Sequence, residues 1–495
     1  MTEGPGEVAP EPGELLAARR AKLDRLRADG VDPFPHAYPG VGPIAGVHAT
    51  HTDLPDGQDT DARYRVAGRL AARRGQGKMA FLDLVDRSGR IQLQAKLDVL
   101  GPEPMERLLG LDLGDLIGVD GTAFRSRRGE LSLRVEDFAV LAKSLRPPPD
   151  KFHGLSDVET RFRHRELDLM ASEEARELFV TRARIVAAVR RHLDDEGFVE
   201  VETPVLQPIY GGALAQPFTT HHNDLDRTLY LRIATELYLK RCIVGGLEKV
   251  YELGKDFRNE GVSYKHNPEF TMLEFYEAYA DYEDIARRLE ALVAAAAHAA
   301  GYAGELDFAK PWRRVGFTEA IAQATGIDVL EHRDTGSLTQ AIRAKGLDMP
   351  TDGLSWPALA DDLLSKHVEP GLIEPTIVMD YPVELSPFAK AHRSVPGLTE
   401  RFEAFCNGME IANAFSELND PDVQRERFEA QARLAAAGDD ETQPFDEAFL
   451  SALEQGMPPT GGIGIGIDRL VMLLTGRRSI REVVLFPAMR DVRES

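Results

Sequence analysis

The chain has 495 residues, of which 43% are hydrophobic, so its length suffices for about two to four domains with sizeable cores. Its net charge of −22 argues against wholesale binding to polyanions, although a local basic patch remains possible. Cys242 and Cys406 are the only cysteines, which excludes a cysteine-built zinc site or a disulfide framework and is typical of a reducing compartment. With no secretory signal and no apolar run of membrane-spanning length, we expect a cytoplasmic protein without a membrane segment.

Residues 1–62 are expected to form a tail, one basic helix and a linker. Residues 1–13 are rich in Pro, Gly and Glu, which predicts disorder. Residues 14–29, "ELLAARRAKLDRLRAD", have leucines near helical spacing, five Arg or Lys residues and a stop at Gly30, which predicts an amphipathic helix. Its basic face is either simply solvated or touches RNA. "DPFPHAYPGVGP" then predicts a linker.

Residues 63–147 predict a five-stranded barrel of the oligonucleotide-binding (OB) kind. Short alternating runs are separated by turn signals such as "RSGR" and "DG". Between residues 63 and 96, nine Arg or Lys residues stand against two Asp, which reverses the charge balance of the chain. Phe81 lies near this patch and Gln92 on the next strand, and an aromatic ring beside an amide and basic groups is how such barrels stack and read single-stranded bases. The alternative is that Phe81 belongs to the barrel core.

The pattern changes in residues 148–495. Ser172, followed by two Glu residues, predicts a helix start, and the helix runs to Gly197. "FVEVETPVL" predicts a strand interrupted by Pro204, which therefore belongs at an edge or boundary.

"KVYELGKDFRNEG" and "HNPEFTMLEFYEAY" predict an antiparallel pair of strands joined by a long polar loop. Arg258 at the end of the first strand can pair with a phosphate through its planar fork. Phe270, Met272, Glu274 and Tyr276 share one face of the second strand, and Phe270 offers a face to a heterocycle. A carboxylate on this mostly apolar face needs a partner, so Glu274 either pairs with a protein arginine or awaits a cationic ligand.

In "RFEAFCNGMEIANAFSELND", the "NG" at 407–408 predicts a hairpin with a type I′ turn. Regular pairing would set Phe405 opposite Glu410 and Glu403 opposite Ala412. Glu403 and Glu410 would then lie diagonally on one face, within reach of each other.

Two carboxylates so placed repel each other unless one is protonated or a cation bridges them, and Mg²⁺ is the natural bridge. The alternative is a solvated pair. Regular alternation would place Asn413, Phe415 and Glu417 on the opposite face of the strand from Glu410. If they serve the same site as Glu403 and Glu410, a bulge or strong twist is needed within 411–414.

"GGIGIGIDRLVMLL" predicts a glycine-dense strand that runs into an apolar helix, with Arg469 at the junction. The chain lacks both a GxGxxG motif here and a P-loop, so neither a Rossmann fold nor a P-loop fold is indicated. Glycines let the backbone approach a flat ligand, and Arg469 can stack on that ligand or meet a phosphate.

"GFVEVETP", "FRNEG…HNPEF" and "GIGIGIDRL" resemble motifs 1, 2 and 3 of the class II aminoacyl-tRNA synthetases. With "GGALAQPFTTHHNDLD", "ATELYLKR" and "NAFSELND", the stretch from about residue 14 to Arg490 is similar to the bacterial lysyl-tRNA synthetases. The resemblance implies an α+β chain: an N-terminal OB-fold β-barrel (63–147) for the anticodon, then a class II catalytic domain (148–495) with a six- or seven-stranded antiparallel sheet flanked by helices. It also implies a homodimer with Pro204 at the interface.

The resemblance further implies ATP, lysine and tRNA(Lys) as substrates and Mg²⁺ as cofactor, with Arg258 and Arg469 as catalytic residues. The ATP-binding residues would be Arg258, Glu260, His266, Phe270, Glu403 and Arg469. The lysine-binding residues would be Gly212, Glu236, Glu274, Tyr276, Asn413, Phe415 and Glu417. Glu403 and Glu410 would hold the metal, and Arg74, Phe81, Gln92 and Glu130 would contact the anticodon, with Phe81 stacked on its central U.

Two positions depart from the family pattern: Gln216 stands where Arg is common, and Leu214 where a small residue is usual. Both border the expected amino-acid site. Three alternatives stay open. One is a paralogue that lysylates a protein such as elongation factor P, although such enzymes typically lack the barrel. The others are an aspartate or asparagine enzyme, which the acidic pocket disfavours, and an inactive RNA-binding homologue.

Overall fold

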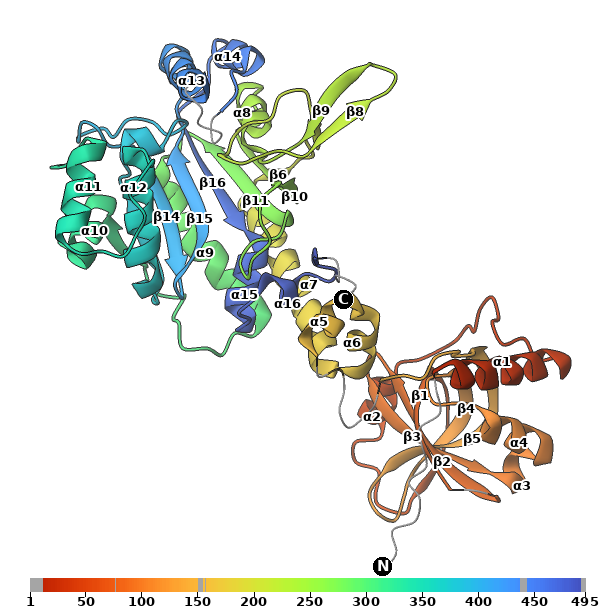
Figure 1. Cartoon of the computed structure of the whole chain (residues 1–495). Helices are drawn as coiled ribbons and strands as arrows, with labels where there is room; N and C mark the ends of the chain where they lie inside the picture. The colour runs from red at the N-terminus through yellow and green to blue at the C-terminus, as the bar shows by residue number, and fades with distance from the viewer. Residues whose placement is uncertain (1–11, 76, 150–154, 156, 437–442, 491–495) are drawn as a thin grey trace, which may run out of the picture. The chain divides into compact units, whose positions relative to one another are not determined.

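The computed structural model describes residues 12–75, 77–149, 155, 157–436 and 443–490 (Figure 1). The tail predicted to be disordered lies almost entirely outside these residues. The chain divides into two compact units, Met1–Ser156 and Asp157–Ser495. The first carries the barrel and the second the large sheet.

The first unit is built on a closed barrel of five strands in the order β1-β2-β3-β5-β4, which confirms the predicted OB-like fold. Leu82, Leu84 and Leu93 alternate with polar residues and are fully buried inside it. Two short helices between β3 and β4 were not predicted. The elements are β1 (Asp59–Arg74), β2 (Met79–Asp86), β3 (Gly89–Lys96), α3 (Leu97–Leu100), α4 (Pro102–Gly110), β4 (Leu116–Arg125) and β5 (Leu131–Ala142).

The predicted basic helix is α1 (Pro12–Ala28). Leu23 and Leu26 are buried, and Arg19 donates hydrogen bonds to the backbone carbonyls of Ser144 and Leu113, both at 3.1 Å. The helix is therefore anchored to the rest of its unit. A second helix, α2 (Ile44–Thr50), follows the predicted linker, because Ile44 and Val47 reach the barrel core.

The second unit contains an eight-stranded sheet in the order β12-β13-β14-β15-β16-β11-β10-β6 (Figure 1). The six strands from β13 to β10 are antiparallel to their neighbours, and one parallel strand is added at each edge. The expectation of six or seven antiparallel strands thus left out the two parallel edge strands, β6 and β12. The strands are β6 (Val199–Glu200), β10 (Lys249–Phe257), β11 (Glu269–Ala278), β12 (Arg313–Gly316), β13 (Thr376–Met379), β14 (Arg401–Cys406), β15 (Met409–Ser416) and β16 (Thr460–Gly466).

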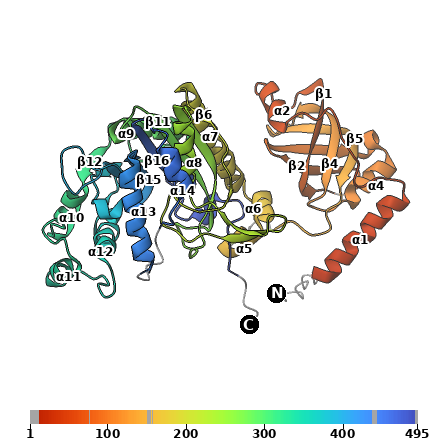
Figure 2. The same ribbon diagram turned by 90° about the horizontal axis from the view of Figure 1, so that it is seen from above.

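Three helices, α7 (Glu173–Asp195), α9 (Tyr282–Ala300) and α15 (Ile467–Thr475), share the main core with this sheet; α7 and α9 are labelled in Figure 2 and α15 in Figure 1. Ser172 caps α7 by accepting a hydrogen bond from the Ala175 N–H, as predicted, and Asp281 caps α9. Because side chains alternate across a strand, the residues between these core positions, such as Glu274 and Tyr276, face away from this helical layer.

The remaining elements surround the sheet. β6 ends at Glu200, so Pro204 lies beyond a two-residue edge strand, consistent with the predicted boundary. The other elements are α5 (Val158–Arg163), α6 (Arg165–Ala171), β7 (Leu206–Gln207), β8 (Thr219–His222), β9 (Arg227–Leu231), α8 (Glu236–Val244), α10 (Phe317–Thr325), α11 (Thr335–Ala344), α12 (Trp356–Leu363), η1 (Leu364–Val368), η2 (Glu369–Gly371), η3 (Val383–Leu385), α13 (Pro421–Ala436), α14 (Glu447–Leu453) and α16 (Ile480–Val483).

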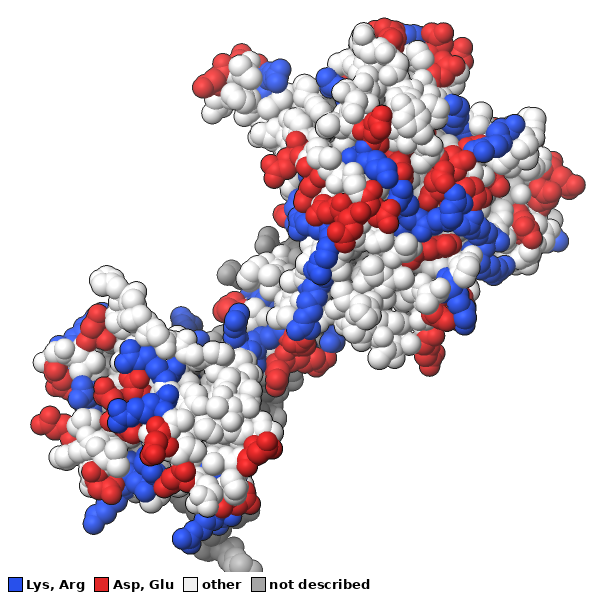
Figure 3. Space-filling model, turned by 180° about the vertical axis from the view of Figure 1, so that it is seen from behind, with Lys and Arg blue, Asp and Glu red and all other residues white. Residues whose placement is uncertain are grey.

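Charged side chains of both signs are interspersed over the face of each unit drawn in Figure 3. Within the described residues, no helix combines the length and the apolar character that crossing a membrane requires.

Candidate active site

A cavity of about 310 Å³ lies on the sheet face opposite the helices and is lined by residues of β11, β15, β16 and the start of α15. It brings together residues that are up to 268 positions apart, from Gly212 to Ile480. All the residues predicted for the ATP and amino-acid sites line it, except Glu403 and Glu417. Those that line it, together with Glu410, are Gly212, Glu236, Arg258, Glu260, His266, Phe270, Glu274, Tyr276, Asn413, Phe415 and Arg469.

Arg258 and Phe270 form a cation beside an aromatic ring at the base of the loop between β10 and β11. Asp256 pairs with Phe270 in the antiparallel register, and the Arg258 guanidinium carbon lies 5.1 Å from the centre of the Phe270 ring. The Arg258 Nε is buried and has no hydrogen-bond partner among the described residues. A guanidinium with unused donors beside a flat face suits a ligand that carries both a phosphate and a heterocycle.

A second cation, Arg469, contacts His266 of this loop. Arg469 Nη1 donates to both the backbone carbonyl and the side-chain Oε2 of Glu410, each at 3.0 Å, and Nη2 lies 3.3 Å from His266 Nε2. Burial, followed by the charges of Arg469 and Lys265, lowers the pKa of His266. His266 is therefore a neutral hydrogen-bonding group beside two cations at neutral pH.

The hairpin of β14 and β15 confirms the predicted turn and the predicted bulge. Asn407 and Gly408 have φ angles of 53° and 67°, the left-handed pair that a type I′ turn requires. Phe405 pairs with Glu410 as predicted, but the register shifts between Ala404 and Phe405.

Because Ile411 is the extra residue in this bulge, Glu403 pairs with Asn413, and the predicted pairing with Ala412 is wrong. Glu403, Asn413 and Phe415 therefore share one face of the hairpin. The bulge therefore allows Glu410 and the residues Asn413 and Phe415, which regular alternation would place on opposite faces, to meet at one site.

Each of the two carboxylates predicted for a metal contacts an arginine. Glu403 Oε1 lies 2.6 Å from Arg401 Nη2, and Tyr381 donates its hydroxyl to Glu403 Oε2 at 2.9 Å, while Glu410 pairs with Arg469. Burial raises the pKa of Glu403 to about 7, and repulsion from Glu410 adds to that rise. In the described ranges, no three His, Cys, Asp or Glu side chains converge as a preformed metal site.

Glu274 is buried, with 5% of its surface exposed, and lines the cavity. Its Oε1 accepts from the Thr235 N–H and its Oε2 from the Tyr276 hydroxyl, both at 3.0 Å. No lysine or arginine of the described chain pairs with it, so the alternative of an internal salt bridge is wrong. Burial, then repulsion from Asp256 and Glu236, raises the pKa of Glu274 to about 8, which a cationic ligand would reverse.

Glu236 and Glu417 sit on either side of a buried lysine. Lys240 Nζ lies 2.5 Å from Glu236 Oε1 and 2.5 Å from Glu417 Oε2, and the side chains of Lys240 and Glu417 are fully buried. A Cβ on Gly462 would come within 2.2 Å of Glu417 Oε1 and 2.3 Å of Tyr276 Cε1, so only glycine fits between them.

In the barrel, the residues predicted to contact RNA lie on its outer surface. Phe81 is half-buried between the fully buried Ala80 and Leu82, so it does not belong to the core, and it pairs with Arg74 on β1. Gln92 Oε1 accepts from the Ser132 hydroxyl at 3.3 Å, and Glu130 is exposed just before β5.

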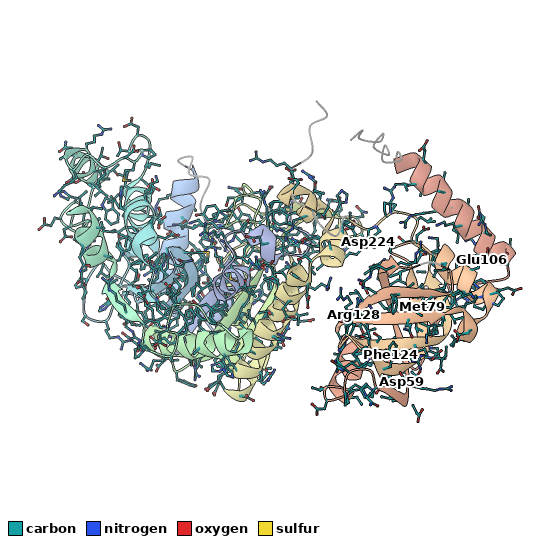
Figure 4. All side chains as sticks on the ribbon, turned by 90° about the horizontal axis from the view of Figure 1, so that it is seen from below. Asp59, Met79, Glu106, Phe124, Arg128 and Asp224 are labelled. Carbon is teal, nitrogen blue, oxygen red and sulfur yellow. The ribbon has the colours of Figure 1, made fainter. Side chains whose placement is uncertain are left out.

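Phe124, which was not among the predicted residues, is a second aromatic ring of the barrel, but it is buried, with 6% of its surface exposed. The guanidinium of Arg134 lies 5.0 Å from the centre of the Phe124 ring and pairs with Asp59 at 2.9 Å. Phe124 and Asp59, labelled in Figure 4, lie on neighbouring strands of the barrel.

Comparison with known proteins places this geometry in a family. Residues 157–490 match the family of class II tRNA synthetases (D, K and N), and residues 64–141 match the OB-fold nucleic acid binding domain. A lysine--tRNA ligase of Roseiflexus castenholzii is 53% identical over 489 residues, which cover 97% of this chain and 99% of the relative. The chain belongs to the class II lysine--tRNA ligases. Lysine--tRNA ligases of Moorella thermoacetica (50% identical) and Clostridium perfringens (48%) cover 97% and 98% of the chain, and 99% and 98% of their own lengths. The chain is thus an aminoacyl-tRNA synthetase.

In this lysine--tRNA ligase, the loop with the two unusual residues is held at both ends. The Gln443 side chain accepts from the Gly212 N–H at 3.2 Å and donates to the Ala213 carbonyl, and the Gln216 carbonyl accepts from the Asn259 N–H at 2.8 Å. Leu214 lies between these anchors and is exposed.

Gln443 and Lys240 were not among the predicted site residues. Lys240 carries a sequence signal, because it follows Glu236 by four residues on a helix and such pairs face each other. Gln443 belongs to no recognisable motif, so nothing in its sequence neighbourhood pointed to the loop it contacts.

Proposed function

We propose that the cavity activates lysine with ATP to lysyl-adenylate and pyrophosphate, and that the enzyme then transfers the lysyl group to the 3′ end of tRNA(Lys). The observation that carries this proposal is the buried Glu274 carboxyl: it faces a cavity that Arg258 and Arg469 also line, yet no lysine or arginine among the described residues pairs with it. An amino acid with a side-chain ammonium supplies that missing charge. A neutral analogue would leave the carboxylate unpaired, which is a strong basis for rejection.

In the first step, a carboxylate oxygen of lysine forms a bond to the α-phosphorus of ATP, and the bond from that phosphorus to the bridging oxygen breaks as pyrophosphate leaves. In the second step, a ribose hydroxyl of the terminal nucleotide attacks the lysyl carbonyl and AMP leaves. Neither step needs a protein nucleophile, so positioning and charge neutralisation account for the catalysis.

Arg258 is assigned to the α-phosphate, where its free donors would stabilise the charge that develops during attack, while Phe270 stacks on adenine. Arg469 covers the opposite adenine face and reaches the γ-phosphate. Glu260 reads the adenine amino group, and the neutral His266 hydrogen-bonds near the polyphosphate.

Glu274 and Tyr276 are assigned to the side-chain ammonium of lysine, and Glu236 and Gly212 to its α-amino end. Asn413 and Phe415 would complete the pocket, with Glu417 contributing its charge from behind Gly462.

Glu403 and Glu410 would hold Mg²⁺. Their carboxylates repel each other, and burial already opposes ionisation of Glu403, so a divalent cation between them relieves both costs. When bound, Mg²⁺ would neutralise charge on the phosphates of ATP. Arg401 has a supporting role: it pairs with Glu403 at 2.6 Å and donates through Nε to Asn413 Oδ1 at 3.2 Å.

The barrel is assigned to the anticodon of tRNA(Lys). Phe81 offers a half-buried ring for stacking, with Arg74 and Gln92 on the adjacent strands and Glu130 just before β5. We also assign the enzyme to the cytoplasm, because charging of tRNA serves translation.

We assign the interface of a homodimer to the edge of the eight-stranded sheet that β6 forms. Apolar side chains stay exposed on and beside that strand and on α7, including Val180, Val199, Val205 and Leu206. A second copy would cover these groups and the free edge.

Charging of a tRNA(Lys) transcript with labelled lysine tests the proposal against its alternatives. We expect charging of tRNA(Lys), and no transfer to elongation factor P. Transfer to that protein alone would favour the protein-lysylating paralogue, and no transfer to either acceptor would favour an inactive RNA-binding homologue.

A further inference from the structure

Lys240 is a fully buried cation at the acidic end of the cavity that none of the proposed roles uses. It lies one helical turn after Glu236 on α8, and its Nζ also lies 5.1 Å from the centre of the Phe388 ring. Glu417, its second partner, follows β15 and is more than 170 positions away in the chain. The ammonium therefore joins two elements that meet only through the fold.

The charges around Lys240 balance a substrate with two ammonium groups. Glu236, Glu274 and Glu417 supply three negative charges when ionised, and Lys240 supplies one positive charge. In the described part of the chain, Lys240 is the only Lys or Arg that contacts any of these three carboxylates. These four side chains then carry a net charge of −2, which matches the two positive charges of the α-ammonium and the side-chain ammonium of lysine.

We propose that Lys240 is a positioning and specificity-determining residue, which holds Glu236 and Glu417 in place and sets the charge of the amino-acid pocket to match lysine. This inference rests on the proposed function.

Two observations separate this role from a simple structural ion pair. Neither carboxylate oxygen of the fully buried Glu417 has a hydrogen-bond partner among the described residues, so the ion pair of Lys240 with Oε2 is what opposes the cost of its charge. Glu236 lines the cavity with Lys240 directly behind it. Removing the ammonium would leave three carboxylates to meet two ammonium groups, and one of them would have to become protonated.

Amino-acid-dependent ATP–pyrophosphate exchange with Lys240→Met tests the inference, because methionine keeps the length and loses the charge. We expect the KM for lysine to rise at least about tenfold while the KM for ATP changes by less than about twofold. Circular dichroism and gel filtration check that the variant folds.

Lys143→Met is a matched control. Lys143 is also fully buried between two carboxylates, at 2.7 Å from Asp112 and 2.8 Å from Asp115, but it lies in the barrel unit. Its replacement should lower the thermal midpoint and leave the KM for lysine in pyrophosphate exchange unchanged.

Lys240→Arg keeps the inference testable if the methionine variant does not fold. The charge remains, but the wider guanidinium displaces Glu236 and Glu417, so we expect a severalfold rise in the KM for lysine alone. The inference is overturned if a folded Lys240 variant keeps the wild-type KM for lysine, or if the KM values for lysine and ATP rise together. Failure of the proposed function is a separate result, because the wild-type enzyme would then show no lysine-dependent exchange.

Discussion

Glu274→Gln removes one charge from the lysine end of the cavity and keeps the shape of the side chain. The amide oxygen can still accept from the Thr235 N–H, and the amide nitrogen can donate to the Tyr276 hydroxyl, so the free enzyme keeps its hydrogen bonds. Because burial already raises the pKa of Glu274 to about 8, the substitution should leave the fold at least as stable at neutral pH and above. The loss should therefore appear in substrate binding.

The size of that loss follows from burial. With 5% of the Glu274 surface exposed, a substrate ammonium is removed from water and meets a neutral amide in the variant. Removing one partner of a buried charge pair costs about 2–5 kcal/mol, and the remaining amide dipole favours the lower half of that range. A cost of about 3 kcal/mol corresponds to a loss of about 150-fold in kcat/KM for lysine.

ATP–pyrophosphate exchange at varied lysine and varied ATP measures this loss. Glu277→Gln is the matched control, because Glu277 is a buried carboxylate of the same strand that pairs with Arg288 and Lys249 instead of lining the cavity. We expect Glu277→Gln to lower stability without changing the KM for lysine. A loss smaller than about threefold in Glu274→Gln, or an equal loss for ATP, would refute the assignment of Glu274 to the substrate ammonium.

Three further predictions address pH, the loop and the barrel. The kcat/KM for lysine should rise with pH up to about 8, because only ionised Glu274 pairs with an ammonium; a flat profile from about pH 6 to 8 would contradict this. Gln443→Ala should raise the KM for lysine about fivefold by freeing the Gly212 N–H and the Ala213 carbonyl, and an unchanged KM would exclude a role for this contact. Phe81→Ala should leave pyrophosphate exchange intact but raise the KM for tRNA(Lys) about tenfold in charging assays, and equal charging by both enzymes would rule out stacking.

Local sequence patterns were enough to predict the strands and turns that form the site. The "NG" turn at 407–408 set one end of the hairpin register. The condition that Glu403 and Asn413 serve one site predicted a bulge or strong twist within 411–414, and the structure has the bulge at Ile411. The same reasoning placed Arg258 and Phe270 at the ends of facing strands.

The contacts that tune the site could not be read from local pattern. Arg401, Lys240 and Gln443 each contact a partner in another element, namely Asn413, Glu417 and Gly212, and the sequence around each residue carries no signal for that distant partner. The edge strands were not predicted for a related reason: β6 contains only two residues, and its pairing with β10 depends on the fold around it. The helix at 44–50 forms because two apolar side chains reach the barrel core.

Pyrophosphate exchange by the wild-type enzyme, with lysine set against aspartate, asparagine, ornithine and no amino acid, tests the central claim most directly. We predict exchange that depends on lysine, with little or none for aspartate and asparagine, because the acidic pocket matches two ammonium groups, and with less for ornithine, whose side chain is one methylene shorter. Exchange with aspartate or asparagine in place of lysine, or none with lysine, would contradict the account.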